Sequence, residues 1–132
     1  MDALATVVSN ALRNGDLAAM TALLANDVRW GDPDQSVPTC TSNSQVLRWY
    51  ENAQLAGASA DVVETVVLGQ NILLGLNVRR DTGPDIESTP AIRWQVMSVE
   101  DDKIAEIRGY DSRVEAERFA TSGTSNWSLR GQ

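Results

Sequence analysis

The chain has 132 residues, 42% of them hydrophobic, so we expect a single domain with its own core. The net charge of −7 argues against a nucleic-acid partner, because neutralising phosphates requires clustered lysine and arginine side chains. The absence of histidine excludes Ser-His and Cys-His nucleophiles and argues against a zinc or non-haem iron site, and we expect no metal and no cofactor.

Three features of the sequence bear on the location of the protein. No apolar run approaches the roughly 20 residues that span a bilayer, and the first residues lack the basic leader of a secretory signal. The single Cys40 cannot form an internal disulfide. These features predict a cytoplasmic protein that does not enter a membrane.

The first half of the chain is predicted to be mostly helical. Apolar residues spaced three and four apart indicate helices over 3–13 and from Leu17 to about Ala25, with Gly15 and Asp16 as the stop and start signals between them. The period changes to that of a strand in "NDVRW". Ser42 and Gln45 then form a capping-box pattern for a third helix that ends at Gly57.

The second half is predicted to be β-structure. Four runs rich in β-branched residues, at 61–70, 71–80, 90–99 and 103–111, are separated by turn-like segments, which favours an antiparallel meander. A short helix follows over 113–120. We expect residues 1–120 to form one domain, and residues 121–132, which include Trp127, to form a polar, mobile tail.

The stretch "VRWGDPDQ" places a carboxylate on the same side as a large aromatic ring. Strand alternation puts Val28, Trp30 and Asp32 on one side, and Pro33 ends the pairing. Asp32 is then either a turn residue before a proline or a carboxylate at the rim of an apolar pocket.

Three segments carry a resemblance that covers most of the chain up to Phe119: "NGDLAAMTALLANDVRWGDP", "SQVLRWYENA" and "MSVEDDKIAEIRGYDSRVEAERF". In this order they resemble the nuclear transport factor two-like superfamily, which includes ketosteroid isomerases, SnoaL-like polyketide cyclases and limonene-epoxide-type hydrolases. The resemblance implies an α+β cone, in which a curved, mostly antiparallel sheet wraps around three N-terminal helices. It also implies an apolar pocket at the open end and a homodimer formed through the outer sheet face.

The isomerase comparison assigns the general base. "WGDP" is similar to the isomerase segment in which an aspartate before proline takes the proton, so the resemblance makes Asp32 the base, with Trp30 beside it as pocket wall. Burial next to an indole disfavours the charged carboxylate and raises its pKa. The tyrosine donor of those enzymes falls at Val8, which has no polar group. Their second donor falls near Gln95 or Trp94.

The epoxide-hydrolase comparison implies an Asp-Arg-Asp set. Gly109 stands where one aspartate is expected, and Asp111, two residues on and on the same face, can substitute for it. Arg93 would bridge Asp32 and Asp111. The alternative is an ordinary salt bridge or solvent-facing charges on the sheet.

The strand at 90–99 has two faces. The apolar pattern alone would make the face with Ile92, Trp94 and Val96 the core. Counting from the hairpin instead directs Arg93, Gln95 and Met97 to the pocket, where Ile107 and Gly109 of the last strand would also face. The other face then carries three large apolar residues, Ile92, Trp94 and Val96. Left bare, these would form an exposed patch, which predicts a dimer contact.

Two functions of different classes follow. The first is a cofactor-independent acid–base enzyme of isomerase or cyclase type, or an epoxide-opening one, acting on a small apolar molecule similar to a polyketide, terpenoid or steroid. Its catalytic residues would be Asp32, Gln95 and Asp111. The second is a dimeric module that binds such a ligand without turnover. Core packing is expected for Trp49 and Tyr50, and no nucleophilic role is expected for Cys40.

Overall fold

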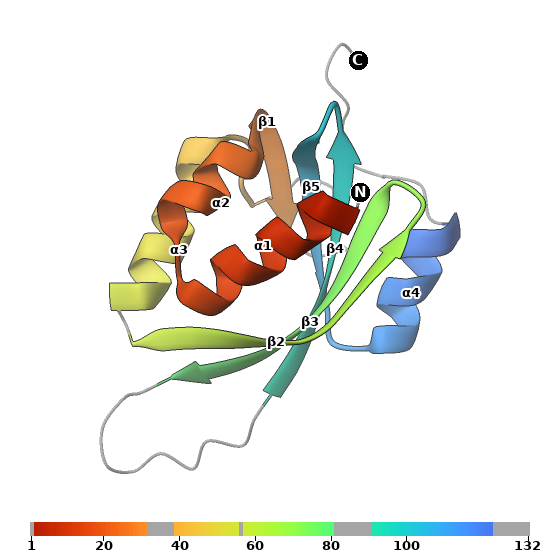
Figure 1. Cartoon of the computed structure of the whole chain (residues 1–132). Helices are drawn as coiled ribbons and strands as arrows, with labels where there is room; N and C mark the ends of the chain where they lie inside the picture. The colour runs from red at the N-terminus through yellow and green to blue at the C-terminus, as the bar shows by residue number, and fades with distance from the viewer. Residues whose placement is uncertain (1, 32–38, 56, 81–90, 123–132) are drawn as a thin grey trace.

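The computed structural model describes residues 2–31, 39–55, 57–80 and 91–122 (Figure 1). The elements in chain order are α1 (Asp2–Asn14), α2 (Leu17–Leu23), β1 (Leu24–Gly31), α3 (Asn43–Leu55), β2 (Ala58–Leu68), β3 (Asn71–Arg80), β4 (Ala91–Glu100), β5 (Lys103–Tyr110) and α4 (Arg113–Ser122). This is the predicted order, and the boundaries agree with the predicted ones to within three residues.

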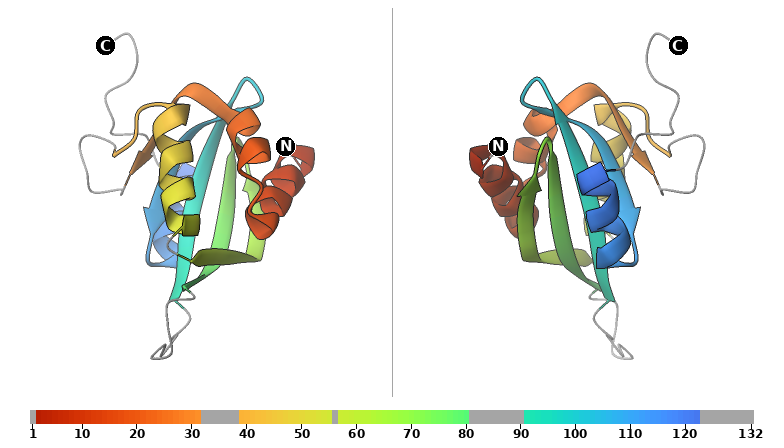
Figure 2. Two further views of the ribbon diagram at one scale, coloured as in Figure 1. Left: turned by 90° about the vertical axis from the view of Figure 1, so that its left-hand side faces the viewer. Right: turned by 90° about the vertical axis from the view of Figure 1, so that its right-hand side faces the viewer.

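The five strands form one mixed sheet in the order β1-β5-β4-β3-β2. The ladders from β2 to β5 are antiparallel, which confirms the predicted meander, and β1 joins the edge in parallel with β5. The sheet curves around α1, α2 and α3, while α4 lies on its opposite face (Figure 2). The α+β cone fold is therefore confirmed, and we call the face toward the three N-terminal helices the inner face.

The predicted break between the first two helices is confirmed. Gly15 has a φ of +62°, and the Asp16 carboxylate accepts a hydrogen bond of 3.1 Å from the Ala19 amide. The second helix ends at Leu23, two residues before the predicted end. The Lys103 ammonium donates to the Ala22 carbonyl over 2.6 Å, so a residue far along the chain caps this helix.

The capping pattern before α3 is also observed. The Gln45 amide donates to the Ser42 hydroxyl over 3.3 Å, and the Gln45 side-chain oxygen accepts from the Thr41 amide over 2.7 Å. A pair of backbone hydrogen bonds between Trp30 and Cys40, of 2.9 and 3.0 Å, ties the end of β1 to the segment that leads into α3.

Each face of the sheet has its own apolar cluster. The inner cluster joins α1, α2 and α3 to the sheet; its fully buried members include Val8, Val28, Val46, Met97 and Ile107. The outer cluster lies between the sheet and α4 and contains Leu73, Val96, Tyr110, Ala116 and Ala120. The two alanines allow α4 to approach the sheet closely.

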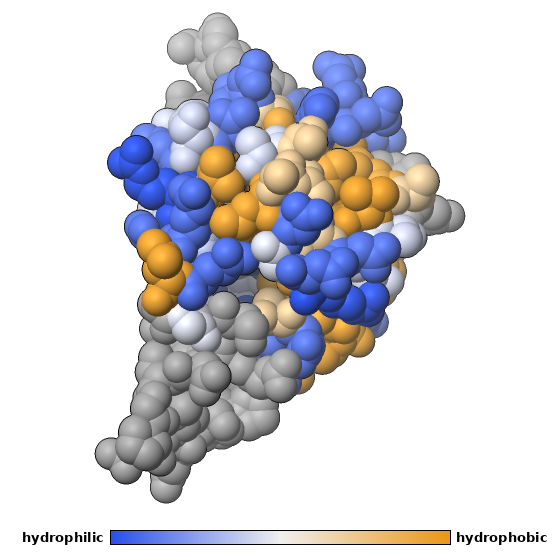
Figure 3. Space-filling view, turned by 60° about the vertical axis from the view of Figure 1, so that its left-hand side comes forward, coloured by the Kyte–Doolittle hydropathy of each residue, from blue (hydrophilic) through white to orange (hydrophobic). Residues whose placement is uncertain are grey.

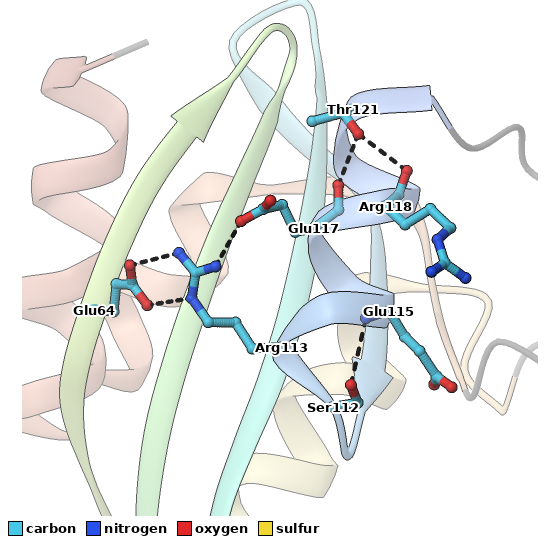
Figure 4. Close-up of polar contacts among 7 residues, drawn as sticks. All are labelled: Glu64, Ser112, Arg113, Glu115, Glu117, Arg118 and Thr121. Carbon is cyan, nitrogen blue, oxygen red and sulfur yellow. Dashed lines mark hydrogen bonds and ion pairs between the residues drawn. The ribbon is translucent and has the colours of Figure 1, made fainter.

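Polar contacts also hold α4 against the sheet (Figure 4). The Arg113 guanidinium donates to both carboxylate oxygens of Glu64 on β2, each over 2.8 Å, and also pairs with Glu117. At the other end of the helix, the Asn71 side chain donates to the Ala120 carbonyl over 2.8 Å.

The cover provided by α4 corrects the prediction about the outer face. Val96 is fully buried and Trp94 is partly buried within one chain, while Ile92 is 45% exposed. The three residues therefore do not form one bare apolar patch, and the argument for a dimer that rested on such a patch does not hold.

The hairpin between β4 and β5 and the last helix complete the described chain. The hairpin tip at Asp101 and Asp102 is exposed, with φ of 52° and 62°. The last helix reaches Ser122, two residues beyond the predicted domain boundary, and Trp127 lies outside the described residues. None of the described helices combines the length and the apolar character needed to cross a membrane.

Candidate functional site

The inner face of the sheet can be followed in rows across the strands. Trp30 of β1 lies opposite Ile107 of β5, which lies opposite Met97 of β4. Both Ile107 and Met97 are fully buried, whereas Trp30 is half-buried. These three predicted substrate-binding residues therefore form one row, in which the aliphatic pair belongs to the packed core.

The next row contains the predicted residues Gly109 and Gln95, which lie opposite each other, and Leu74 beyond them. The Gln95 side chain is half-buried, and its Oε1 atom is buried with no hydrogen-bond partner in the part of the chain that the structure describes. Gly109 brings no side chain to this row. An unpaired carbonyl oxygen thus faces the interior beside a position without a side chain.

The predicted pair Arg93 and Asp111 is brought together at the end of these strands. Arg93 Nη1 forms a short ion pair with Asp111 Oδ1, and the side chains are 42% and 87% exposed. The pair thus lies at the exposed rim, where solvent screening weakens it.

Asp32, the predicted base, lies outside the described residues, so its contacts are not described. It follows Gly31, the last residue of β1, and Gly31 is opposite Arg108 of β5. Val8, the predicted counterpart of the isomerases' tyrosine donor, is fully buried in the inner cluster.

Three aromatic side chains meet at the β1 edge of the inner face. The ring centre of Trp30 is 5.1 Å from that of Trp49 and 5.2 Å from that of Tyr50, both on α3. Tyr50 packs against the inner cluster, as predicted, while Trp49 is 50% exposed. The three rings pack against one another at tilted angles and border this part of the inner face.

Tyr50 has a feature that the sequence does not reveal. Its phenol oxygen is buried without a hydrogen-bond partner among the described residues. Burial raises the pKa of the phenol, and nearby Cys40 raises it further. Burial also raises the pKa of the Cys40 thiol, in keeping with the expectation that it is not a nucleophile. The only clue to this hydroxyl in the sequence is a tyrosine on an apolar helix face. Core packing explains such a tyrosine equally well.

The outer face of the sheet carries a cluster of buried charged side chains. Glu106 pairs with Arg29 over 2.8 Å and with Arg108 over 3.3 Å, and the Arg108 guanidinium carbon is 4.6 Å from the ring centre of Phe119 on α4. These residues alternate with Trp30 and Ile107 along their strands and so point away from the inner face. They connect β1, β5 and α4.

Metal-ligating residues are scattered in the described ranges. No three aspartate, glutamate or cysteine side chains come together there in a way that could hold a metal ion.

The helical side of the molecule carries apolar patches between polar side chains (Figure 3).

Comparison with known proteins decides the family. The model of the SnoaL-like domain matches residues 5–107, which is most of the chain. The chain belongs to the SnoaL-like family. The predicted resemblance is therefore confirmed at the level of the family. No curated protein sequence matches the chain.

Solved structures share the fold of this SnoaL-like domain at low identity. A suggested ketosteroid isomerase from Kribbella flavida is 20% identical, with a TM-score of 0.66 over 81% of this chain and 73% of that one. A suggested polyketide cyclase from Sinorhizobium meliloti is 18% identical, with a TM-score of 0.61 over 81% and 93%. An LEH-like epoxide hydrolase from M. tuberculosis is 20% identical, with a TM-score of 0.61 over 81% and 78%.

Proposed function

We propose that this SnoaL-like protein is a cofactor-independent acid–base enzyme of isomerase or cyclase type that acts on a small, largely apolar molecule, with Asp32 as its general base. The observation that carries the proposal is the inner row next to Trp30, where Gln95 presents an unpaired, buried oxygen beside Gly109. Apolar walls with a few unpaired polar groups are typical of small-molecule sites.

The place of Asp32 in the chain supports its role. In the sequence Asp32 directly follows Gly31, the last residue of β1. Its neighbour by two residues, Trp30, faces the inner cluster. A carboxylate in such surroundings is a stronger base than one in water, because its charged form is poorly solvated.

The remaining predicted roles follow from this arrangement. Gln95 would hydrogen-bond the oxygen on which charge develops, and its amide can serve as donor after a half-turn about its last bond. Trp30, Met97, Ile107 and Gly109 would line the substrate site.

An epoxide-opening reaction is the second candidate. The observed ion pair between Arg93 and Asp111 favours it, because a guanidinium that bridges two carboxylates is the arrangement implied by the epoxide-hydrolase comparison. In this proposal Asp111 would act with Asp32, and Arg93 would hold both. Because both side chains are exposed, this ion pair supports an epoxide-opening reaction less strongly than the inner row supports an isomerase or cyclase reaction.

Other expectations stay predictions. A module that binds a ligand without turnover would have the same interior as the proposed enzyme and would differ from it only in lacking catalysis. A homodimer stays a prediction, for which Ile92 is exposed and Val96 is not. A cytoplasmic location stays a prediction from the single Cys40 and the lack of a basic leader.

Substitution of Asp32 tests the enzyme proposal. We expect Asp32→Asn to lower turnover by about 10²- to 10⁴-fold, the usual contribution of a general base. A panel of a β,γ-enone, an epoxide and a polyketide-like β-ketone, followed by absorbance and product analysis, identifies the reaction.

The matched control is Asp61→Asn, which changes an exposed aspartate of β2 and should leave turnover unchanged. Equal turnover by Asp32→Asn and the wild-type protein would remove Asp32 from the mechanism. Loss of activity in Asp111→Asn but not in Asp32→Asn would also contradict the proposal.

A further inference from the structure

The outer face of the sheet buries charged side chains at a place where apolar ones would fit. Arg29, Glu106 and Arg108, which we call the charged cluster, have side chains that are at most 10% exposed. Arg108 lies opposite Val96 in the ladder, and its guanidinium carbon is 4.6 Å from the centre of the Phe119 ring. Replacing a buried ion pair by apolar side chains of similar size is often neutral or stabilising, so stability alone does not explain the charged cluster.

The strand that the charged cluster joins to the sheet has a short and irregular ladder. β1 is the edge strand next to β5, so only one of its sides is paired within the sheet. The ladder matches Leu24 with Ile104, then shifts in register, and then matches residues 29–31 with residues 106–108. A shift of one residue would turn the side chains at the end of β1 to the opposite face of the sheet. So short a ladder needs side-chain contacts to select one register.

The charged cluster provides a contact of this kind. Arg29 and Glu106 are direct partners in the ladder, and Arg29 Nη2 is 2.8 Å from Glu106 Oε2. The other carboxylate oxygen accepts from Arg108 Nη2 over 3.3 Å. A one-residue shift of β1 would replace Arg29 on this face by Val28 or Trp30. Glu106 would then lose its cross-strand partner and face an apolar side chain, so the shifted register is disfavoured.

The register of β1 also determines what the inner face receives. Trp30, the residue after Arg29, lies opposite Ile107 and packs against the inner cluster. Its backbone exchanges two hydrogen bonds with Cys40, of 2.9 and 3.0 Å. Asp32 lies between Trp30 and Cys40 in the sequence, so the chain on both sides of Asp32 is held at the end of β1.

We propose that Arg29, Glu106 and Arg108 are positioning residues, which fix the register of β1 and so direct Trp30 to the inner face and set the point from which the chain continues to Asp32. They act on the candidate site from the opposite side of the sheet. This inference rests on the proposed function for the identity of the site, whereas the register of β1 can be measured without turnover.

A triple variant, Arg29→Met with Glu106→Leu and Arg108→Met, separates positioning from stability, because it replaces the charges by apolar side chains of similar size. Amide hydrogen exchange followed by NMR reports the Trp30 and Cys40 hydrogen bonds. We expect both amides to exchange about tenfold faster, the factor typical of a lost charge-assisted hydrogen bond, while the amides of β3 and β4 keep their rates. We expect kcat to fall about 10²-fold with little change in KM, because small displacements of reacting groups cost this much.

Two further variants serve as controls. Arg29→Lys keeps a cation opposite Glu106 and should keep exchange and kcat close to the wild-type values. Glu64→Leu with Arg113→Met removes the other carboxylate–guanidinium pair of the outer face, which joins β2 to α4, and should change neither readout. If the triple variant does not fold, Arg29→Met alone carries the same expectations, because Glu106 keeps its contact with Arg108.

Three results would overturn the inference. Wild-type exchange at Trp30 and Cys40 would show that the charged cluster does not hold β1, and equally faster exchange in β3 and β4 would show that it serves stability alone. Faster exchange at Trp30 and Cys40 with unchanged kcat would show that the register of β1 does not matter to the site. Failure of the proposed function would appear differently, as equal turnover by Asp32→Asn and the wild-type protein, whatever the exchange rates.

Discussion

Gly75 has no side chain on the outer face of β3, and the indole of Trp94 occupies that space. A Cβ atom added at Gly75 would lie 2.5 Å from Trp94 Cζ3 and 3.0 Å from Val63 Cγ2. The Arg113 guanidinium carbon is 5.7 Å from the centre of the Trp94 ring. The indole is thus held between a bare strand position and a cation of α4, which explains why it is partly buried in a single chain.

We therefore expect Gly75→Ala to lower the free energy of unfolding by about 1–3 kcal/mol, the usual cost of overpacking. Urea unfolding of a double-mutant cycle checks this expectation. In a Trp94→Ala background the same change should be neutral or stabilising, because alanine suits a strand better than glycine. An equal loss in both backgrounds would show that the indole is not the obstacle.

Among the elements, α4 most changes the interpretation of the sequence. It covers Leu73 and Val96, and its Arg113 is bonded to Glu64 of β2 through both carboxylate oxygens. The hydrogen bonds from Arg113 lower the pKa of Glu64, an effect that partial burial opposes and the charge of Arg113 assists. The attachment of the helix should therefore depend on pH.

The sign of this dependence follows from linkage. A carboxyl group whose pKa is lowered in the folded state contributes stability above its unfolded pKa, about 4.3 for glutamate, and loses it as pH falls through the folded value. We expect Glu64→Gln to lower the melting temperature by a few degrees at pH 7. The difference from the wild-type protein should shrink as the pH falls below the unfolded pKa and vanish once the Glu64 carboxyl is protonated in the folded state.

Circular dichroism melts between pH 2.5 and 7 measure this effect. The control is Glu51→Gln, which changes an exposed glutamate of α3 and should leave the melting temperature nearly unchanged. A constant gap between Glu64→Gln and the wild-type protein at every pH would contradict the ionic origin of the contact.

In the whole molecule, the two faces of the sheet have different roles. Its inner face carries the apolar cluster with the unpaired Tyr50 and Gln95 atoms, and its outer face carries α4 and the buried Arg29, Glu106 and Arg108 cluster. The candidate site therefore belongs to the inner face, while the outer face stabilises the edge strand and the last helix.

The sequence predicts the parts of this arrangement that depend on local pattern. The period of apolar residues locates the helices and the meander. The count from the hairpin, and not the alternation along 90–99, correctly assigns Met97 to the inner face. It could not predict that α4 buries Val96, because alternation shows that a face is apolar and not what covers it. It also missed the early end of α2 at Leu23, where the chain passes directly into β1 and the Ala22 carbonyl accepts from Lys103.

The candidate site is only partly predictable for the same reason. The hairpin count predicts that Gln95 and Gly109 both face the pocket, and the structure places them opposite each other in the ladder. Tyr50 was assigned to core packing, since its position on an apolar helix face does not reveal that its hydroxyl lacks a partner.

The central claim, that Asp32 sits in apolar surroundings beside Trp30, is tested most directly by a carbon NMR titration of its carboxyl group, assigned by comparison with Asp32→Asn. Poor solvation of the charged form predicts a pKa clearly above the ordinary aspartate value of about 3.9. An ordinary or lowered pKa would mean that water or a cation stabilises the carboxylate, and would contradict its role as a base raised in strength by burial.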